Sequence, residues 1–134
     1  MDATARSALD QERYVSLVTY RKTGRAVPTP VWFALAGERF YVFTEADAGK
    51  VKRLRNDARV QLSGCNVRGK VHGAPYDGRA AVTDSQEAID RAYEALRAKY
   101  GWQMRVTDFF SRLAGRIDGR AMLEIEVDGP ASEG

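Results

Sequence analysis

Two prolines, Pro28 and Pro30, stand at alternate positions in a stretch that is otherwise typical of a β-strand, AVPTPVWFAL at residues 26–35. Proline has no backbone N–H and cannot donate to a ladder of hydrogen bonds. A strand that contains proline therefore begins at a sheet edge, a bulge or the rim of a barrel. Two interpretations of this segment stay open. The prolines discourage aggregation at an exposed edge, or they leave the strand backbone free to face a planar ligand beside Trp32 or Phe33.

The rest of the sequence predicts a mainly β protein with a few helices. Runs rich in β-branched and aromatic residues, or alternating between apolar and polar, predict further strands at residues 14–20, 39–44, 59–64, 78–84 and 120–127. Helical spacing predicts helices at 49–57, 84–100 and about 104–114, with Asp47 and Asp84 as caps of the first two. A parallel α/β fold needs strict alternation of strand and helix, which this order lacks. We therefore predict a small antiparallel barrel with helices packed outside it.

Length and composition indicate one domain. The 134 residues, 44% hydrophobic and 29% charged, are sufficient to bury a core. We expect a polar lead-in at residues 1–8, the barrel domain at 9–128 and a flexible tail at 129–134. The single cysteine, Cys65, fits a reducing compartment. With no signal-peptide core and no run of about 20 apolar residues, we expect a cytoplasmic protein without a membrane segment.

Positive charge is concentrated in one short segment. Residues 50–59 carry five Lys or Arg and one Asp, a net +4, whereas the whole chain carries 21 basic and 18 acidic residues, a net +3. The remainder therefore sums to −1, which disfavours a surface that binds nucleic acid broadly. Two interpretations remain, a solvated helix face and an anion site at a helix N-terminus, where Thr44 ends a strand and Gly49 and Lys50 open the helix. On a helical wheel Lys50 and Arg55 flank the apolar stripe, while Lys52 and Arg53 point away from it.

Other catalytic chemistries find little support. His72 is the only histidine, and no cluster of carboxylates accompanies it or Cys65, so a zinc site or a nucleophilic triad is not expected. We interpret His72 as a surface residue and Cys65 as a small buried hydrophobe. The glycine-rich signatures of Rossmann and P-loop nucleotide sites do not occur.

The order and spacing of several short pieces resemble a known family. These pieces are TPVWF, VFT before the basic helix, GKVKRLRNDARV, CNVRGK and KYGWQMR. Across residues 9–127 the chain is similar to the flavin-binding split β-barrel proteins related to pyridoxamine phosphate oxidases, and within them to the branch that uses the deazaflavin coenzyme F420. This resemblance implies a homodimeric split barrel with two cofactor sites at the subunit interface.

The resemblance also implies site residues. The strand around Thr29, Pro30, Val31 and Trp32 would lie along the cofactor ring. The phosphate would be received by Phe43, Thr44, Gly49 and Lys50, Lys52 would reach the phosphate or an acidic tail, and Arg68 and Gly69 would lie where the partner strand approaches. The arginine that heads the ring-contacting strand of true pyridoxamine phosphate oxidases is replaced here by Thr29 and Pro30, so that activity is not expected.

The implied function is hydride transfer between reduced coenzyme F420 and a small conjugated organic acceptor. The alternatives are an FMN-dependent reductase or oxidase of the same fold and a non-catalytic carrier of coenzyme F420. No catalytic side chain is assigned, although Tyr76 and His72 could donate a proton by residue type. Tyr100, Trp102 and Phe109 could line an acceptor pocket or simply pack on the barrel. No metal, nucleic-acid or membrane partner is implied.

Overall fold

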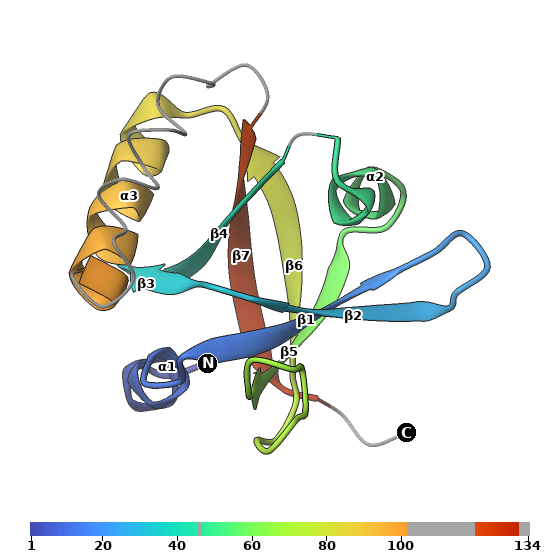
Figure 1. Cartoon of the computed structure of the whole chain (residues 1–134), viewed down its shortest axis with the longest axis horizontal. Helices are drawn as coiled ribbons and strands as arrows, with labels where there is room; N and C mark the ends of the chain where they lie inside the picture. Colours follow the sequence, from blue (N-terminus) through green and yellow to red (C-terminus); the bar gives the residue numbers. More distant parts are fainter. Residues whose placement is uncertain (46, 102–119, 132–134) are drawn as a thin grey trace.

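A computed structural model of the chain describes residues 1–45, 47–101 and 120–131. It contains three helices and seven strands (Figure 1). The elements are α1 (Ala3–Asp10), β1 (Tyr14–Tyr20), β2 (Ala26–Val31), β3 (Ala34–Ala36), β4 (Arg39–Glu45), α2 (Gly49–Asn56), β5 (Arg59–Cys65), β6 (Tyr76–Thr83), α3 (Gln86–Tyr100) and β7 (Arg120–Pro130). None of the described helices is long and apolar enough to cross a membrane.

All strands belong to one antiparallel sheet in the order β2-β1-β5-β6-β7-β4-β3. The two edge strands, β2 and β3, follow each other in the chain and are separated only by Trp32 and Phe33. Two linking residues span at most about 10 Å, so the sheet must curl until its edges approach each other at this corner (Figure 1). The prediction of a mainly β, antiparallel split barrel with peripheral helices is confirmed.

The prolines lie at an edge, as their chemistry requires. In β2, Pro28 and Pro30 pair in register with Val18 and Ser16 of β1, and the other side of β2 is the end of the sheet. The interleaved residues of β2 must supply the hydrogen bonds to β1, because the prolines cannot. The expectation of one continuous strand over residues 26–35 is wrong, because the chain breaks at Trp32 and Phe33 and resumes as β3.

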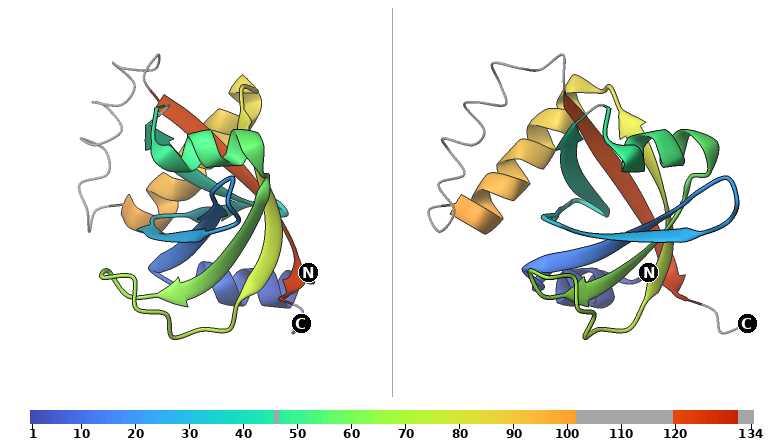
Figure 2. Two further views of the ribbon diagram at one scale, coloured as in Figure 1. Left: turned by 90° about the vertical axis from the view of Figure 1, so that its right-hand side faces the viewer. Right: turned by 45° about the vertical axis from the view of Figure 1, so that its right-hand side comes forward.

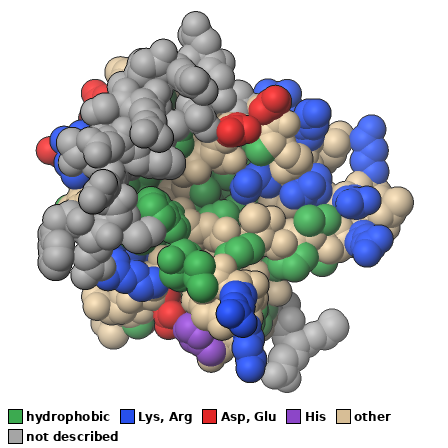
Figure 3. Space-filling model, viewed as in Figure 1, with side chains coloured by type: hydrophobic (Ala, Val, Ile, Leu, Met, Phe, Trp, Pro, Cys, Tyr) green, Lys and Arg blue, Asp and Glu red, His purple; other side chains and the backbone are tan. Residues whose placement is uncertain are grey.

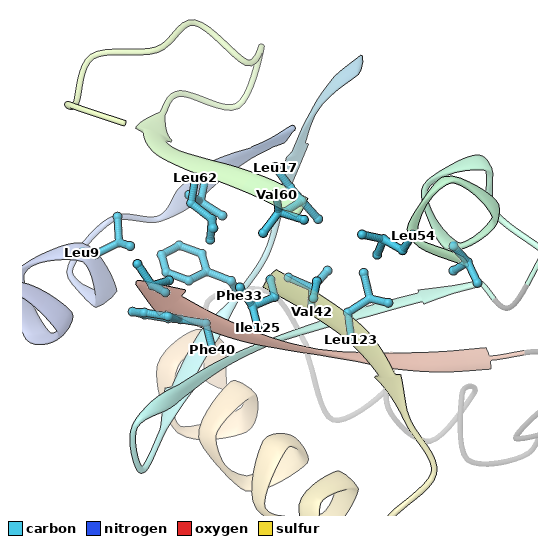
Figure 4. Packing of buried hydrophobic residues seen from close by; sticks show 14 of the residues in the cluster. Leu9, Leu17, Phe33, Phe40, Val42, Leu54, Val60, Leu62, Leu123 and Ile125 are labelled. Atoms are coloured by element: carbon cyan, nitrogen blue, oxygen red, sulfur yellow. The ribbon is translucent and has the colours of Figure 1, made fainter. Parts of the chain in front are cut away.

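The barrel interior holds the larger core cluster (Figure 4). Buried side chains from five strands, β1, β4, β5, β6 and β7, meet there with Phe33 of the link between β2 and β3; Leu17, Val42, Leu62 and Ile125 are among them. The helices α1 and α2 lie at opposite ends of the barrel (Figure 2). They close it with Leu9 of α1 and with Val51 and Leu54 of α2, all of which are buried in this cluster.

Helix α3 covers the outer face of β3, β4 and β7. Its residues Ala88, Ala92, Leu96 and Tyr100 form a second buried cluster with side chains of those strands. The hydroxyl of Tyr100 accepts a hydrogen bond from the Phe33 N–H at 3.0 Å. It also lies 3.0 Å and 2.9 Å from the carbonyl oxygens of Phe33 and Arg13, to which its proton can be donated. Helix α3 therefore fixes the backbone at the corner where the sheet edges approach.

Several local features differ from the sequence-based expectations. Residues 3–10 form a helix within a segment expected to be a polar lead-in, because Asp2 caps it and Leu9 anchors it to the core. Strand β7 continues to Pro130, paired with Tyr76, into the segment expected as a tail. Ala48 precedes α2 without a side-chain cap, and Ser85 rather than Asp84 caps α3. The helix expected at 104–114, with Trp102 and Phe109, lies outside the described residues.

Replacing Tyr100 by Phe should destabilise the protein by about 1–3 kcal/mol, because it leaves the buried N–H of Phe33 without an acceptor. Urea unfolding followed by tryptophan fluorescence measures this loss. The matched control is Tyr76→Phe, which removes a hydroxyl that makes no hydrogen bond within the described part of the chain. Equal stability of the two variants would contradict the conclusion that the Tyr100 hydroxyl stabilises the backbone at Phe33.

Candidate functional site

The start of α2 has the properties of an anion site. The N-cap residue Ala48 offers no side-chain acceptor, and within the described residues no acceptor is recorded for the backbone N–H groups of Gly49 and Lys50. The N–H groups of a helix's first turn, with the positive end of the helix dipole, favour a bound anion. Thr44, near the end of β4, is buried, and Lys50 is half-buried. The structure thus places Thr44, Gly49 and Lys50 in one short strand-to-helix turn.

Arg53 is a further cation of this site. Its Nε donates to the Thr19 hydroxyl of β1 at 2.6 Å, and its guanidinium turns back toward the first turn of α2. A Cβ built on Gly49 would lie only 2.8 Å from Arg53 Nη1, so glycine leaves room for this arrangement. The prediction that Arg53 points away from the buried face is wrong, because the curl of the sheet brings Thr19 within its reach.

Three cations, Lys50, Arg53 and Arg21, act on one another at this site. Burial lowers the pKa of Lys50, and the neighbouring positive charge of Arg53 lowers it further, while Glu45 acts in the opposite direction. Burial also lowers the pKa of Arg53, with Arg21 contributing repulsion. Figure 3 shows Lys and Arg side chains gathered over this part of the molecule, beside an apolar strip. A bound anion would relieve this repulsion.

Two of the residues predicted to contact a ring, Thr29 and Val31, share one face of β2. They pair with Leu17 and Val15 of β1, whose side chains are buried in the barrel. Thr19, the partner of Arg53, pairs with Val27 on the same face. The face therefore runs from the cations at α2 toward the corner of the sheet.

Pro30 lies on the opposite face and contacts the β5–β6 hairpin, which we define as residues 66–73. A Cβ built on Gly69 would lie 3.6 Å from Cδ and Cγ of Pro30. The structure therefore brings Gly69 and Pro30 together, although 39 positions separate them in the sequence. Arg68 is exposed at the tip of this hairpin, and Lys52 is exposed on α2. In the part of the chain that the structure describes, no side-chain hydrogen bond or ion pair joins either of them to the other predicted residues.

Trp32 and Phe43 pack under α3. The Trp32 ring stacks on Tyr100 at 4.9 Å between centroids and an angle of 16°, and the Phe43 ring lies 5.4 Å from that of Tyr93. Both belong to the margin of the outer cluster. Tyr100 is buried and its hydroxyl is bonded to backbone, which agrees with the packing interpretation of that residue.

The proton-donor candidates differ in their surroundings. His72 Nε2 lies 2.6 Å from Glu12 Oε2, a partner that the sequence did not indicate, and its side chain is 53% exposed. Tyr76 is half-buried in β6. Cys65 is buried, as expected, and burial raises the pKa of its thiol, with the Glu12 charge adding to the effect. Within the described ranges, no group of three or more His, Cys, Asp or Glu side chains is arranged to hold a metal ion.

The sequence matches the pyridoxamine 5'-phosphate oxidase family over residues 1–129. The chain belongs to this family. Membership fits the split barrel and the cationic strand-to-helix turn, and it does not specify the reaction. No curated protein matches the sequence.

Solved structures show the same fold at low sequence identity. A conserved hypothetical protein from Mycobacterium tuberculosis has a TM-score of 0.73 at 19% identity, over 96% of this chain and 81% of that one. The heme storage protein HutZ from Vibrio cholerae has a TM-score of 0.67 at 16% identity, over 98% of this chain and 91% of that one. An FAD-binding protein from Mesorhizobium loti has a TM-score of 0.64 at 17% identity, over 96% of this chain and 89% of that one.

Neutralising Lys50 should not destabilise the free protein. A pKa that is lower in the folded than in the unfolded state means that protonated Lys50 opposes folding, so its cost is present at neutral pH and is lost as pH rises through that pKa. We expect Lys50→Gln to leave the free energy of unfolding within about 0.5 kcal/mol of the native value or to raise it.

Arg59→Gln is the matched control, because Arg59 is paired with Asp57 at 2.7 Å and lies over the Tyr20 ring at 4.8 Å. Urea unfolding at neutral pH should therefore show a loss of stability for Arg59→Gln. A larger loss for Lys50→Gln would show that Lys50 is a structural residue.

Proposed function

We propose that this protein is an oxidoreductase that transfers a hydride between reduced coenzyme F420 and a small conjugated organic acceptor. The observation that carries the proposal is the group of mutually repelling cations Lys50, Arg53 and Arg21 near the N-terminus of α2, which has no side-chain cap at Ala48. Coenzyme F420 bears a phosphate, a carboxylate and an oligoglutamate tail, and it is more anionic than FMN. Family membership supports a flavin-like ligand of this general kind.

The chain's own residues would bind and orient the ligand. The N–H groups of Gly49 and Lys50 would donate to the phosphate, and the Lys50 ammonium would supply a charge at short range. Lys52, exposed two positions after Lys50, would reach a more distant carboxylate of the tail. The face of β2 that carries Thr29 and Val31 would hold the ring. When bound, the deazaflavin supplies the hydride.

We assign no side chain as general acid, and solvent can provide the proton. The proposal includes a homodimer with the cofactor at the subunit interface, in which the free edge of β2 and the hairpin face the partner. The expected species in size-exclusion chromatography with light scattering has twice the 14.9 kDa of one chain.

Two alternatives keep the same site. An FMN-dependent reductase or oxidase would need only one phosphate at the α2 turn, and the fold likeness to an FAD-binding protein favours testing it. A non-catalytic carrier would bind coenzyme F420 without oxidising it. Yellow protein on purification would indicate the flavin, and consumption of reduced coenzyme F420 with quinone, enone and tetrapyrrole acceptors would separate the enzyme from the carrier.

Titration of the purified protein should show saturable binding of coenzyme F420 at micromolar concentration, with weaker binding of FMN. We expect Lys50→Gln to weaken binding about 10- to 100-fold, because a hydrogen bond to a charged group contributes about 1.5–3 kcal/mol. Adding Lys52→Gln should weaken it further. Fluorescence or calorimetric titration at fixed ionic strength measures both effects.

Arg55→Gln is the control, since Arg55 lies exposed in the last turn of the same helix and carries the same charge. Equal losses for Arg55→Gln and Lys50→Gln would indicate a general electrostatic effect and not a site. Undiminished affinity of Lys50→Gln would contradict the proposed binding site directly.

A further inference from the structure

The β5–β6 hairpin folds back over the outer face of the sheet. Beyond β5 the chain makes a tight turn in which the Asn66 side chain accepts hydrogen bonds from the N–H groups of Arg68 and Lys70, both at 2.9 Å. Gly69, at φ 88°, takes a backbone conformation that favours glycine. The turn therefore has a defined shape of its own, and its tip reaches Pro30 of β2.

The hairpin passes across β1 to reach β2. In the sheet register Ser16 of β1 stands between Ser63 of β5 and Pro30 of β2. Both serines are buried, with 2% and 6% of their surface exposed, although they lie on the face opposite to the barrel core. Their burial is explained by the hairpin above them, which spans from Cys65 to Pro30.

His72 joins the base of the hairpin to β5 and to the residues before β1. Its backbone N–H donates to the Gly64 carbonyl at 3.0 Å, and its Nε2 lies 2.6 Å from Glu12 Oε2. Glu12 precedes β1 and lies directly over Gly64, where a Cβ would come within 2.7 Å of Glu12 Cδ. One ion pair thus joins the hairpin to the chain that leads into β1.

The charged and titratable surroundings of this pair come from three elements. Cys65 of β5 lies within range of the Glu12 charge, and burial raises the pKa of its thiol, so it stays neutral. Lys99 of α3 also interacts electrostatically with Glu12, although its ion pair is with Asp10 at 3.1 Å. Arg68 and Lys70 are exposed on the hairpin itself. The contact between His72 and Glu12 is an ion pair only when the imidazole is protonated, and histidine is the side-chain type that serves as a charge switch near neutral pH.

We propose that His72 and Glu12 are positioning residues of the cofactor site, holding the hairpin against Pro30 while the imidazole is protonated and releasing it as pH rises. This inference rests on the proposed function, in which the face of β2 that carries Thr29 and Val31 holds the cofactor ring and Pro30 lies on the other face of the same strand. Neither residue touches the ligand. They act indirectly, because they hold the hairpin in place. The hairpin contacts Pro30 on one face of β2, and the opposite face of β2 would hold the ring.

The direction of the pH dependence follows from the charges. With a protonated imidazole the pair is ionic and the hairpin is held. A neutral imidazole keeps at most a weaker hydrogen bond to the Glu12 carboxylate. Cofactor affinity should therefore fall between pH 6 and pH 8, by about two- to fivefold, the range that a half-exposed ion pair supports.

The experiment titrates coenzyme F420 and, separately, FMN into the native protein and three variants at pH 6 and pH 8. His72→Gln keeps a hydrogen-bond donor without the charge, and Glu12→Gln removes the carboxylate. Both should bind at pH 6 as the native protein binds at pH 8. His72→Arg keeps a permanent cation and should restore the tighter binding at pH 8. Protonation of the cofactor's own phosphate affects the affinity of all four proteins alike. A difference in pH dependence between the native protein and the variants therefore measures the contribution of the pair of His72 and Glu12.

Amide hydrogen exchange gives a readout that does not need the cofactor. The N–H groups of Asn66, Gly69, His72 and Gly73 are hydrogen-bonded within or below the hairpin. At pH 6 they should exchange faster in His72→Gln than in the native protein, and at pH 8 the two should differ less. Since His72 is the only histidine of the chain, its ring protons can be followed by NMR without assignment ambiguity.

The outcomes separate the two proposals. Native affinity with the same pH dependence in His72→Gln overturns the positioning role and leaves the proposed function standing. Equal amide exchange in both proteins at pH 6 overturns it as well. If the native protein shows no saturable binding of either cofactor, the proposed function is overturned, and so is the proposed effect on affinity. The hydrogen-exchange comparison still decides whether the pair of His72 and Glu12 holds the hairpin.

Discussion

The architecture depends on the corner at Trp32 and Phe33, where the two edges of a seven-stranded sheet are joined by two residues. This covalent constraint obliges the sheet to curl, and the Tyr100 hydroxyl holds the Phe33 backbone in the bent position. Asp10 stabilises the same corner, since its carboxylate accepts a hydrogen bond from the Leu35 N–H and forms an ion pair with Lys99. Through this corner α1, β3 and α3 stabilise one another, and the curled sheet creates the interior that α1 and α2 close.

The same curl assembles the candidate site. Thr19 and Arg53 are far apart in the sequence, and they meet because β1 and the helix that closes the barrel converge at one end. The result is a group of cations whose mutual repulsion is offset by few carboxylates. Some charges elsewhere are paired, as Arg59 with Asp57 and Arg91 with Glu87. The mutual repulsion of the cations at α2 supports a binding role for them, because a purely structural surface gains nothing from concentrated repulsion.

Much of the fold could be predicted because the information is local. Alternating apolar residues, the two prolines and the basic helix start each act within a few positions, and the strand and helix types followed from them. Local patterns could not show that α1 is a helix, since its single anchor, Leu9, is buried only by the folded barrel. Nor could they show the break after Val31, which exists because a side chain 67 positions away bonds to Phe33.

The sequence by itself determined that the chain is an antiparallel β protein with an edge strand and one local excess of positive charge. Those properties arise from backbone chemistry and from neighbouring side chains. Only the tertiary structure decided which cations act together, that Gly69 lies against Pro30, and that His72 has a carboxylate partner in Glu12. Each of these contacts joins residues from different strands or loops, and their distance depends on how the whole sheet curls.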